Sequence, residues 1–164
     1  MYTVFVNADD IARTQGVSNA QAADLATAER ERRILQCETF AFETVFSRTD
    51  YWLGFIFQAL SNRYRIELYF LCTDDPTVNL ARVETRVEMG GHSVASEKIF
   101  KRYPGSIHTA LLAKTLVDEF WLYDNTRNSQ SPALIGHFTH GKLDDIGSSI
   151  PHWALPFFLE TPLV

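Results

Sequence analysis

Carboxylate side chains follow the first apolar segment of the chain. Asp9 and Asp10 follow the apolar run 2–6, after Asn7 and Ala8. A carboxylate at that point can accept the proton of a substrate hydroxyl or hold a metal–phosphate complex. The pair can equally cap a helix, because an Asp side chain before an Ile-Ala run accepts from free backbone N–H groups. From the local sequence alone, the cap is the favoured interpretation.

Glu43 is a stronger functional candidate because it lies inside an apolar run, residues 40–46. A carboxylate within a strand is costly unless it is paired, or lies at the end of the strand beside a cleft. A second interpretation is a charge on an edge strand that faces water. The sequence supports the two interpretations about equally.

Two arginines form a candidate phosphate site. Arg82 and Arg86 are four residues apart on one expected helix, so they share a face. Two guanidinium groups can hold phosphate oxygens through bidentate hydrogen bonds. Glu84 and Glu88 alternate with them, which is also typical of a solvated charged helix, and for this helix alone that interpretation is favoured.

More basic residues follow that helix. Lys101 and Arg102, together with Arg86 and His92, could form a mobile basic lid over a triphosphate. In isolation, Lys101 and Arg102 are ordinary surface charge.

A glycine-containing segment near the C-terminus does not predict a phosphate loop. Residues 136–142 read Gly-His-Phe-Thr-His-Gly-Lys, but Leu143 occupies the position where Ser or Thr would reach a magnesium ion. Asp144 and Asp145 would also repel a phosphate. We therefore expect a turn between two strands at this point.

The elements that must position these side chains alternate between strands and helices. Apolar runs predict strands over 2–6, 39–46, 66–72, 120–123 and 133–139. Periodicity and end signals predict helices over 21–36, 51–60, 76–89 and 95–116, the last bent or broken near Pro104. The tail 148–164 is expected to wrap the surface irregularly. The alternation indicates an α/β fold with a mainly parallel sheet, which binds ligands at the carboxyl ends of its strands.

Composition narrows the functional class. The chain has 164 residues, 46% hydrophobic and 21% charged, which is typical of one globular domain. The net charge of −5 gives no support for a nucleic-acid partner. No apolar run reaches membrane-spanning length and the N-terminus lacks a signal-peptide pattern, so we expect a cytoplasmic protein without a membrane partner. Cys37 and Cys72 are expected to be buried, reduced thiols, and no Cys/His cluster has the spacing of a metal site.

Taken together, several segments resemble the zeta-toxin family of P-loop kinases, whose characterised members phosphorylate UDP-N-acetylglucosamine with ATP. The segments keep the family order along nearly the whole chain: 6–12 (VNADDIA), 42–47 (FETVFS), 80–87 (LARVETRV), 90–94 (GGHSV), 101–103 (KRY), 122–125 (LYDN) and 151–154 (PHWA). The resemblance implies a single kinase domain over 1–164, incomplete at its N-terminus. It also implies a three-layer fold with a mainly parallel sheet, and ATP with Mg²⁺ as cofactors.

The resemblance implies roles for individual residues. Asp9 matches the base that acts on the sugar hydroxyl, and Arg86 matches an arginine that stabilises the transferring phosphate. The residues that match the sugar-nucleotide site are Asn7, Glu43 and Thr44. Those that match the region of the donor nucleotide and its phosphates are Arg82, His92, Arg102 and Asn125.

The family's first strand, its glycine-rich phosphate loop and the lysine and Ser/Thr of that loop have no counterpart in these 164 residues. Because that loop holds ATP through backbone N–H groups, we expect the 164 residues alone to have no measurable kinase activity. The first strand is central in the family. The resemblance therefore implies a gap that is closed by direct pairing of the strands 39–46 and 66–72, by another chain, or by an N-terminal segment.

Three functions follow from these observations. The first is a zeta-toxin-like kinase, and the second is a non-catalytic module that binds a sugar nucleotide or an antitoxin protein. The third is an assembly role, in which exposed strand edges pair in a homodimer. The second function predicts sugar-nucleotide binding without ATP binding, so binding of neither ligand would count against it, and a monomer would exclude the third.

Overall fold

The computed structural model describes residues 4–91, 93–127 and 131–159, and the chain divides into two compact units. Unit 1 comprises the described residues up to Val45 together with Phe57–Tyr64, and unit 2 comprises Phe46–Ile56 and the described residues from Arg65 onward. Both units contain helices, and each has its own sheet, so the chain is a mixed α/β protein. The expectation of a single domain stays a prediction.

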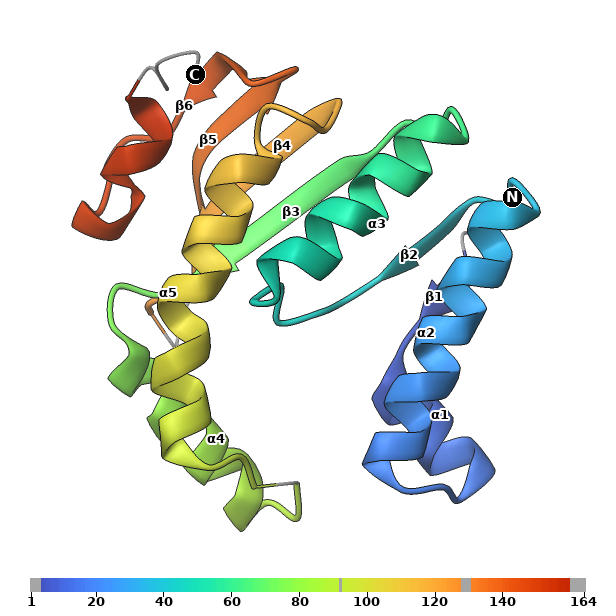
Figure 1. The fold of residues 1–164 in the computed structure, drawn as a ribbon. Coiled ribbons are helices and arrows are strands. Elements are labelled where there is room, and N and C mark those ends of the chain that lie inside the picture. The colour runs from blue at the N-terminus through green and yellow to red at the C-terminus, as the bar shows by residue number, and fades with distance from the viewer. Residues whose placement is uncertain (1–3, 92, 128–130, 160–164) are drawn as a thin grey trace. The chain divides into compact units, whose positions relative to one another are not determined.

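Unit 1 consists of a parallel strand pair and helices. Its elements are β1 (Val4–Val6), α1 (Ala8–Gln15), α2 (Asn19–Leu35), β2 (Phe40–Phe42) and the end of α3 (Thr49–Ser61), as Figure 1 shows. Strands β1 and β2 are parallel, and Val6 lies opposite Phe42. The strand expected over 39–46 is therefore present but spans three residues.

Local signals explain where the helices of unit 1 begin and end. Asn7 is the N-cap of α1, and Gly16 ends this helix with a φ of 66°, a conformation that glycine adopts without strain. Ser18 and Gln21 form a capping box at the start of α2. The expectation that Asp9 or Asp10 caps α1 is wrong by two or three residues. Both carboxylates lie in the first turn, where the helix dipole favours negative charge.

An ion-pair network holds the C-terminal half of α2. Glu29 pairs with Arg32 and Arg33 at 2.8 and 2.7 Å, and Glu38 pairs with the same two arginines at 3.2 and 2.9 Å. The hydrogen bond from Arg32 is the largest cause that lowers the pKa of Glu29 to about 2. The Tyr64 hydroxyl lies 2.8 Å from the backbone oxygens of both Arg33 and Glu38, which ties the end of α2 to the segment that follows α3.

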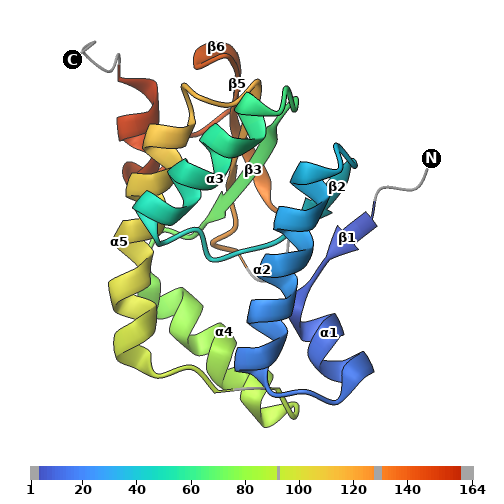
Figure 2. The same cartoon turned by 45° about the vertical axis from the view of Figure 1, so that its right-hand side comes forward.

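Unit 2 is built on a mixed sheet whose order is β3-β4-β5-β6. Its elements, beside the start of α3, are β3 (Glu67–Cys72), α4 (Pro76–Glu88), α5 (Ser96–Ala113), β4 (Glu119–Asp124), β5 (Ala133–Thr139), β6 (Lys142–Ile146) and the 3₁₀ helix η1 (His152–Phe158) (Figures 1 and 2). Helix α5 continues through Pro104 without a break. The turn expected after residue 136 is confirmed, because β5 and β6 form an antiparallel hairpin there.

Parallel pairing is limited to part of the fold. Strands β1 and β2 are parallel, as are β3 and β4, but β4–β5 and β5–β6 are antiparallel. Within the described residues, β2 pairs with β1 alone and β3 with β4 alone. How the expected gap in the sheet is closed stays a prediction.

The two faces of the four-stranded sheet differ. One face carries the core of unit 2, formed by Phe70, Phe120, Leu122, Ile135 and Phe138. The opposite face carries a row of stacked rings on β3, β4 and β5. Tyr69 and Trp121 stack with ring centroids 6.0 Å apart, and Trp121 and His137 with centroids 3.7 Å apart.

The C-terminal tail is part of the core, which corrects the expected irregular surface segment. Trp153, Ala154 and Phe157 of η1 are buried, and Phe157 stacks on Phe120 with centroids 5.6 Å apart. Figure 2 shows η1 beside the C-terminal end of α5, where Lys114 Nζ donates to the backbone oxygen of Phe157 at 2.7 Å. The aromatic residues of η1, which the sequence analysis assigns to an irregular surface segment, therefore cover the apolar face of the sheet.

The two cysteines are both free thiols. Cys72 is buried as expected, but Cys37 is exposed after the end of α2, so that part of the expectation is wrong. No helix among the described residues is long and apolar enough to cross a membrane.

Candidate functional site

In unit 1, a hydrogen bond joins the residues that follow β1 and β2. Asn7 Nδ2 donates to Glu43 Oε1 at 2.7 Å. The other end of the same amide, Oδ1, accepts from the backbone N–H groups of Asp9 and Asp10 at 2.7 and 3.3 Å. Since Oδ1 accepts from these N–H groups, Nδ2 is the end of the amide that points to the carboxylate. The side chain of Asn7 thus connects the start of α1 to the residue that follows β2.

The two carboxylates of this group are open to solvent. Asp9 and Glu43 are exposed, as is Thr44, which follows Glu43. Asp10 forms an ion pair with Arg13 at 2.6 Å. Of the two aspartates that sequence analysis considered, Asp9 is therefore the one without an ion-pair partner among the described residues.

A shallow hollow of about 230 Å³ lies beside β1 and α1. It is lined by Val4, Phe5, Val6, Asn7, Asp10, Ile11, Thr14 and Glu29. Asn7 belongs both to this hollow and to the pair with Glu43, so a ligand in the hollow would come close to that pair.

In unit 2, hydrogen bonds tie the segments that follow β3 and β4. Asn125 N–H donates to Cys72 O at 2.7 Å, and Asp74 N–H donates to Thr126 Oγ1 at 2.9 Å. Arg82 Nη2 from α4 donates to Asn125 O at 2.6 Å. Two residues that the sequence analysis assigned to the nucleotide donor, Arg82 and Asn125, are therefore in direct contact, through the backbone of Asn125.

Arg82 and Arg86 lie on one face of α4, as their spacing predicts, and both line an open hollow of about 700 Å³. Its other lining residues are Ala81, Thr85, Met89, Gly90 and Gly91. The backbone of Gly91 lies against Arg86, since a Cβ at that glycine would be 2.7 Å from Arg86 Cγ. The two glycines that end α4 therefore permit the chain to turn back over the arginine.

Arg102 is exposed on α5, and no hydrogen bond or ion pair within the described residues joins its side chain to Arg82, Arg86 or Asn125. His92 lies outside the described residues. In unit 1, the side chain of Asn7 thus links Glu43 to the backbone of Asp9. In unit 2, Arg82 contacts the backbone of Asn125 and shares a hollow with Arg86.

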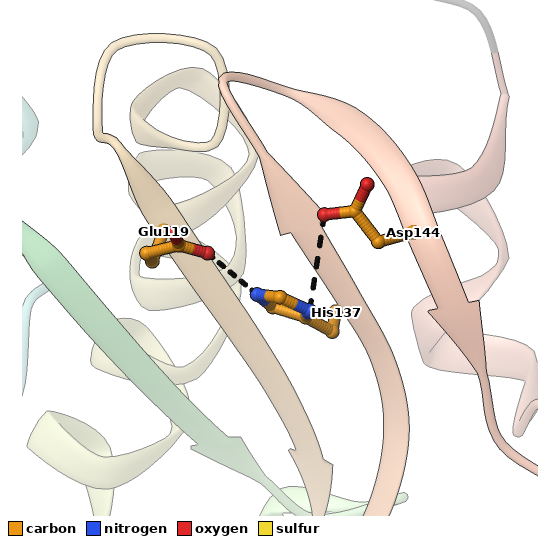
Figure 3. A group of neighbouring side chains, drawn as sticks. All are labelled: Glu119, His137 and Asp144. Carbon is orange, nitrogen blue, oxygen red and sulfur yellow. Dashed lines mark hydrogen bonds and ion pairs between the residues drawn. The ribbon is translucent and has the colours of Figure 1, made fainter.

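A third group was not found by sequence analysis. Glu119 from β4, His137 from β5 and Asp144 from β6 come together on one face of the sheet of unit 2 (Figure 3). The bond to His137 is the largest cause that lowers the pKa of Glu119 below its usual value. A search for Cys/His spacing misses such a group, because strand pairing and not local spacing assembles it. In the sequence, His137 and Thr139 alternate with the apolar residues of β5, which indicates that these two side chains share one face of the sheet.

Comparisons of the chain with models of protein families, with curated proteins and with solved structures found no match.

Proposed function

We propose that this chain is the acceptor-binding part of a zeta-toxin-like kinase, with UDP-N-acetylglucosamine or a related sugar nucleotide as its ligand. The observation that carries the proposal is the 2.7 Å hydrogen bond from Asn7 to Glu43, with Asp9 in the helical turn that Asn7 caps. These are residues that the resemblance assigns to the acceptor, and they follow the ends of two parallel strands. Ligands of α/β sheets bind at such ends.

The chemistry of this group suits a sugar hydroxyl. Asn7 fixes one oxygen of Glu43 through its amide, which leaves Glu43 Oε2 for a hydroxyl donor of the ligand. Asp9 is an exposed carboxylate in the same group and would accept the proton of the hydroxyl that is phosphorylated. Thr44 would add a neutral hydroxyl beside them.

The donor side of the proposal is supported by charge but not by a complete ATP site. Arg82 and Arg86 line one hollow, and two arginines can neutralise phosphate oxygens. The 164 residues contain no Gly-x-x-x-x-Gly-Lys-Ser/Thr segment, so they lack the backbone cradle that holds ATP with Mg²⁺. Phosphoryl transfer would require that cradle from another segment or another chain.

The sheet arrangement of a P-loop kinase is part of the same proposal. In a P-loop kinase the sheet is mainly parallel, and a further parallel strand would pair with β2 and with β3. Each of these strands has one hydrogen-bonded neighbour in the described part of the chain, so each retains an edge for such a strand. An antitoxin or a second copy of the chain is an alternative source of edge pairing.

Calorimetric titration of the 164-residue chain with UDP-N-acetylglucosamine and, separately, with ATP–Mg²⁺ tests the proposal. We expect saturable binding of the sugar nucleotide and no binding of ATP. If the unsubstituted chain does not bind the sugar nucleotide, the assignment of an acceptor site is refuted. ATP binding would show that another segment replaces the missing loop.

Variants locate the site. Glu43→Gln should weaken sugar-nucleotide binding by about tenfold to a hundredfold, since a hydrogen bond to a charged group contributes about 1.5–3 kcal/mol. The matched control is Glu31→Gln, which changes an exposed glutamate on α2 of the same unit. If Glu43→Gln binds the sugar nucleotide as tightly as the parent chain, the role of Glu43 is refuted. If Glu43→Gln and Glu31→Gln lose affinity to the same extent, net charge explains the loss and the role of Glu43 is refuted as well.

A further inference from the structure

Three strands of unit 2 gather two carboxylates and an imidazole on one face of the sheet (Figure 3). Glu119 Oε2 lies 2.6 Å from His137 Nε2, and Asp144 Oδ2 lies 3.8 Å from His137 Nδ1. One ligand atom from each of the three side chains lies within 4.8 Å of the other two. The side chains of Glu119 and His137 are each 17% exposed, so the group is half-buried and still reachable from solvent.

A β-bulge brings Asp144 into this group. His137 pairs with Asp145 and Phe138 pairs with Leu143, which leaves Asp144 as the extra residue of β6. In a regular hairpin the side chains of β6 would alternate between the two faces of the sheet. A bulge redirects one side chain, and here it sets Asp144 beside His137.

The hydroxyl of Thr139 bridges the two carboxylates of the group. Its Oγ1 lies within hydrogen-bond distance of Glu119 Oε2, at 3.1 Å, and also of Asp144 Oδ2. A threonine hydroxyl has one proton and can donate to only one of the two carboxylates at a time. The oxygen of the other carboxylate then faces a lone pair of the hydroxyl oxygen. A cation or a proton between the carboxylates would remove this repulsion.

The nearby positive charges are unevenly placed. Arg65 Nη2 lies 2.9 Å from Glu119 Oε1, which leaves Oε2 directed at His137. Asp144 pairs with no Lys or Arg in the part of the chain that the structure describes. The uncompensated charge is therefore concentrated on the side of Asp144.

We propose that Glu119, His137 and Asp144 bind one divalent first-row transition-metal ion, such as Zn²⁺, and that the ion takes the place of the proton shared by His137 Nε2 and Glu119 Oε2. Oxygen and nitrogen ligands lie about 2.0–2.2 Å from Zn²⁺, so two ligand atoms of one ion are at most about 4.4 Å apart. The three ligand atoms lie within 4.8 Å of one another, so a small approach of the most distant pair would bring all three within reach of one ion. Glu119 Oε2 and His137 Nε2, now 2.6 Å apart, would have to separate to admit it. Thr139 then donates to a ligand oxygen from outside the coordination sphere, as partners of metal ligands commonly do.

The ligand set favours a transition metal over Mg²⁺. Imidazole with carboxylates is a common ligand set for Zn²⁺ and related ions, whereas Mg²⁺ prefers oxygen ligands in near-ideal octahedral geometry. Three protein ligands on a half-exposed face leave room for water or for a group of a ligand. The proposal concerns unit 2 and does not depend on the sugar-nucleotide proposal.

The test is a calorimetric titration of the 164-residue chain with ZnCl₂, in a Cys37→Ser background because the exposed Cys37 thiol could bind Zn²⁺ by itself. We expect one site per chain and weaker binding of MgCl₂. In a nitrogen NMR spectrum, Zn²⁺ should shift the His137 imidazole resonances. No saturable Zn²⁺ binding, or His137 imidazole resonances that do not move with Zn²⁺ in excess, would overturn the proposal.

Asp144→Asn is the informative variant, because Asp144 is exposed and the change keeps the size of the side chain. It should weaken Zn²⁺ binding by about tenfold or more, since loss even of a partner outside the coordination sphere costs about 10–100-fold. Asp145→Asn, one residue along the same strand, should bind like the parent. Circular dichroism without metal checks that both variants fold, and equal binding by the two variants would overturn the assignment of Asp144.

Discussion

Phe157→Ala tests whether the C-terminal segment is part of the core. The Phe157 side chain is fully buried, and its ring centroid lies 5.6 Å from that of Phe120, 6.0 Å from that of Phe70 and 6.3 Å from that of Trp153. Truncation of a buried Phe to Ala typically lowers the free energy of unfolding by about 3–5 kcal/mol. Three aromatic contacts are lost with the ring, so we expect a value in the upper part of this range.

Urea unfolding followed by tryptophan fluorescence measures this effect. Trp52, Trp121 and Trp153 all belong to unit 2, so the signal reports the unit that contains the substitution. With a denaturant slope of about 2 kcal/mol per molar urea, the midpoint should fall by about 2–2.5 M. If Phe157→Ala does not fold, Phe157→Leu keeps most of the buried volume and should show a smaller loss in the same direction.

Leu159→Ala is the matched control, because Leu159 is 67% exposed two residues further along. Its expected loss is within about 0.5 kcal/mol. A loss below about 1 kcal/mol for Phe157→Ala, or equal losses for the two variants, would refute the conclusion that η1 completes the core of unit 2.

Two further predictions concern reactive groups. A thiol reagent at pH 8 should modify Cys37 rapidly and Cys72 slowly, because Cys37 is exposed while burial raises the pKa of Cys72 to about 11; a Cys72→Ser variant that loses the rapid phase would contradict this assignment. Desolvation lowers the pKa of buried Lys114 below its ordinary 10.5, so the unfolded state binds that proton more strongly. The stability of the parent relative to Lys114→Met should therefore rise as the pH increases toward 10.5, and a difference in unfolding free energy that stays constant from pH 7 to 10.5 would count against it.

The helices were the most predictable part of the fold. The predicted helices 51–60 and 76–89 correspond to α3 (Thr49–Ser61) and α4 (Pro76–Glu88), because apolar content, Pro76 and the glycines after α4 are local signals. The cap of α1 was placed on Asp9 or Asp10 instead of Asn7. Asn and Asp are about equally good caps, so the position depends on the backbone angles at each residue.

Strand pairing was less predictable than strand position. The strands over 66–72, 120–123 and 133–139 were expected close to their observed places, but the antiparallel pairing of β4 with β5 was not. The sequence of a strand does not specify whether its neighbour runs parallel or antiparallel to it. The direction depends on the connection between the strands and on which face of the sheet is buried. The same limit applies to the tail, where the burial of Phe157 depends on contacts with Phe70 and Phe120.

The sequence by itself determined helices α2 to α5, the positions of β1 to β5, the paired arginines on α4 and the polar residues after the first two strands. Its resemblance to zeta-toxin kinases supplied the functional hypothesis for those residues. Tertiary structure decided that Asn7 bonds to Glu43, that the tail enters the core and that Glu119, His137 and Asp144 meet. These contacts join residues 18 or more positions apart or depend on a bulge, so strand register creates them, and no local pattern in the sequence specifies register.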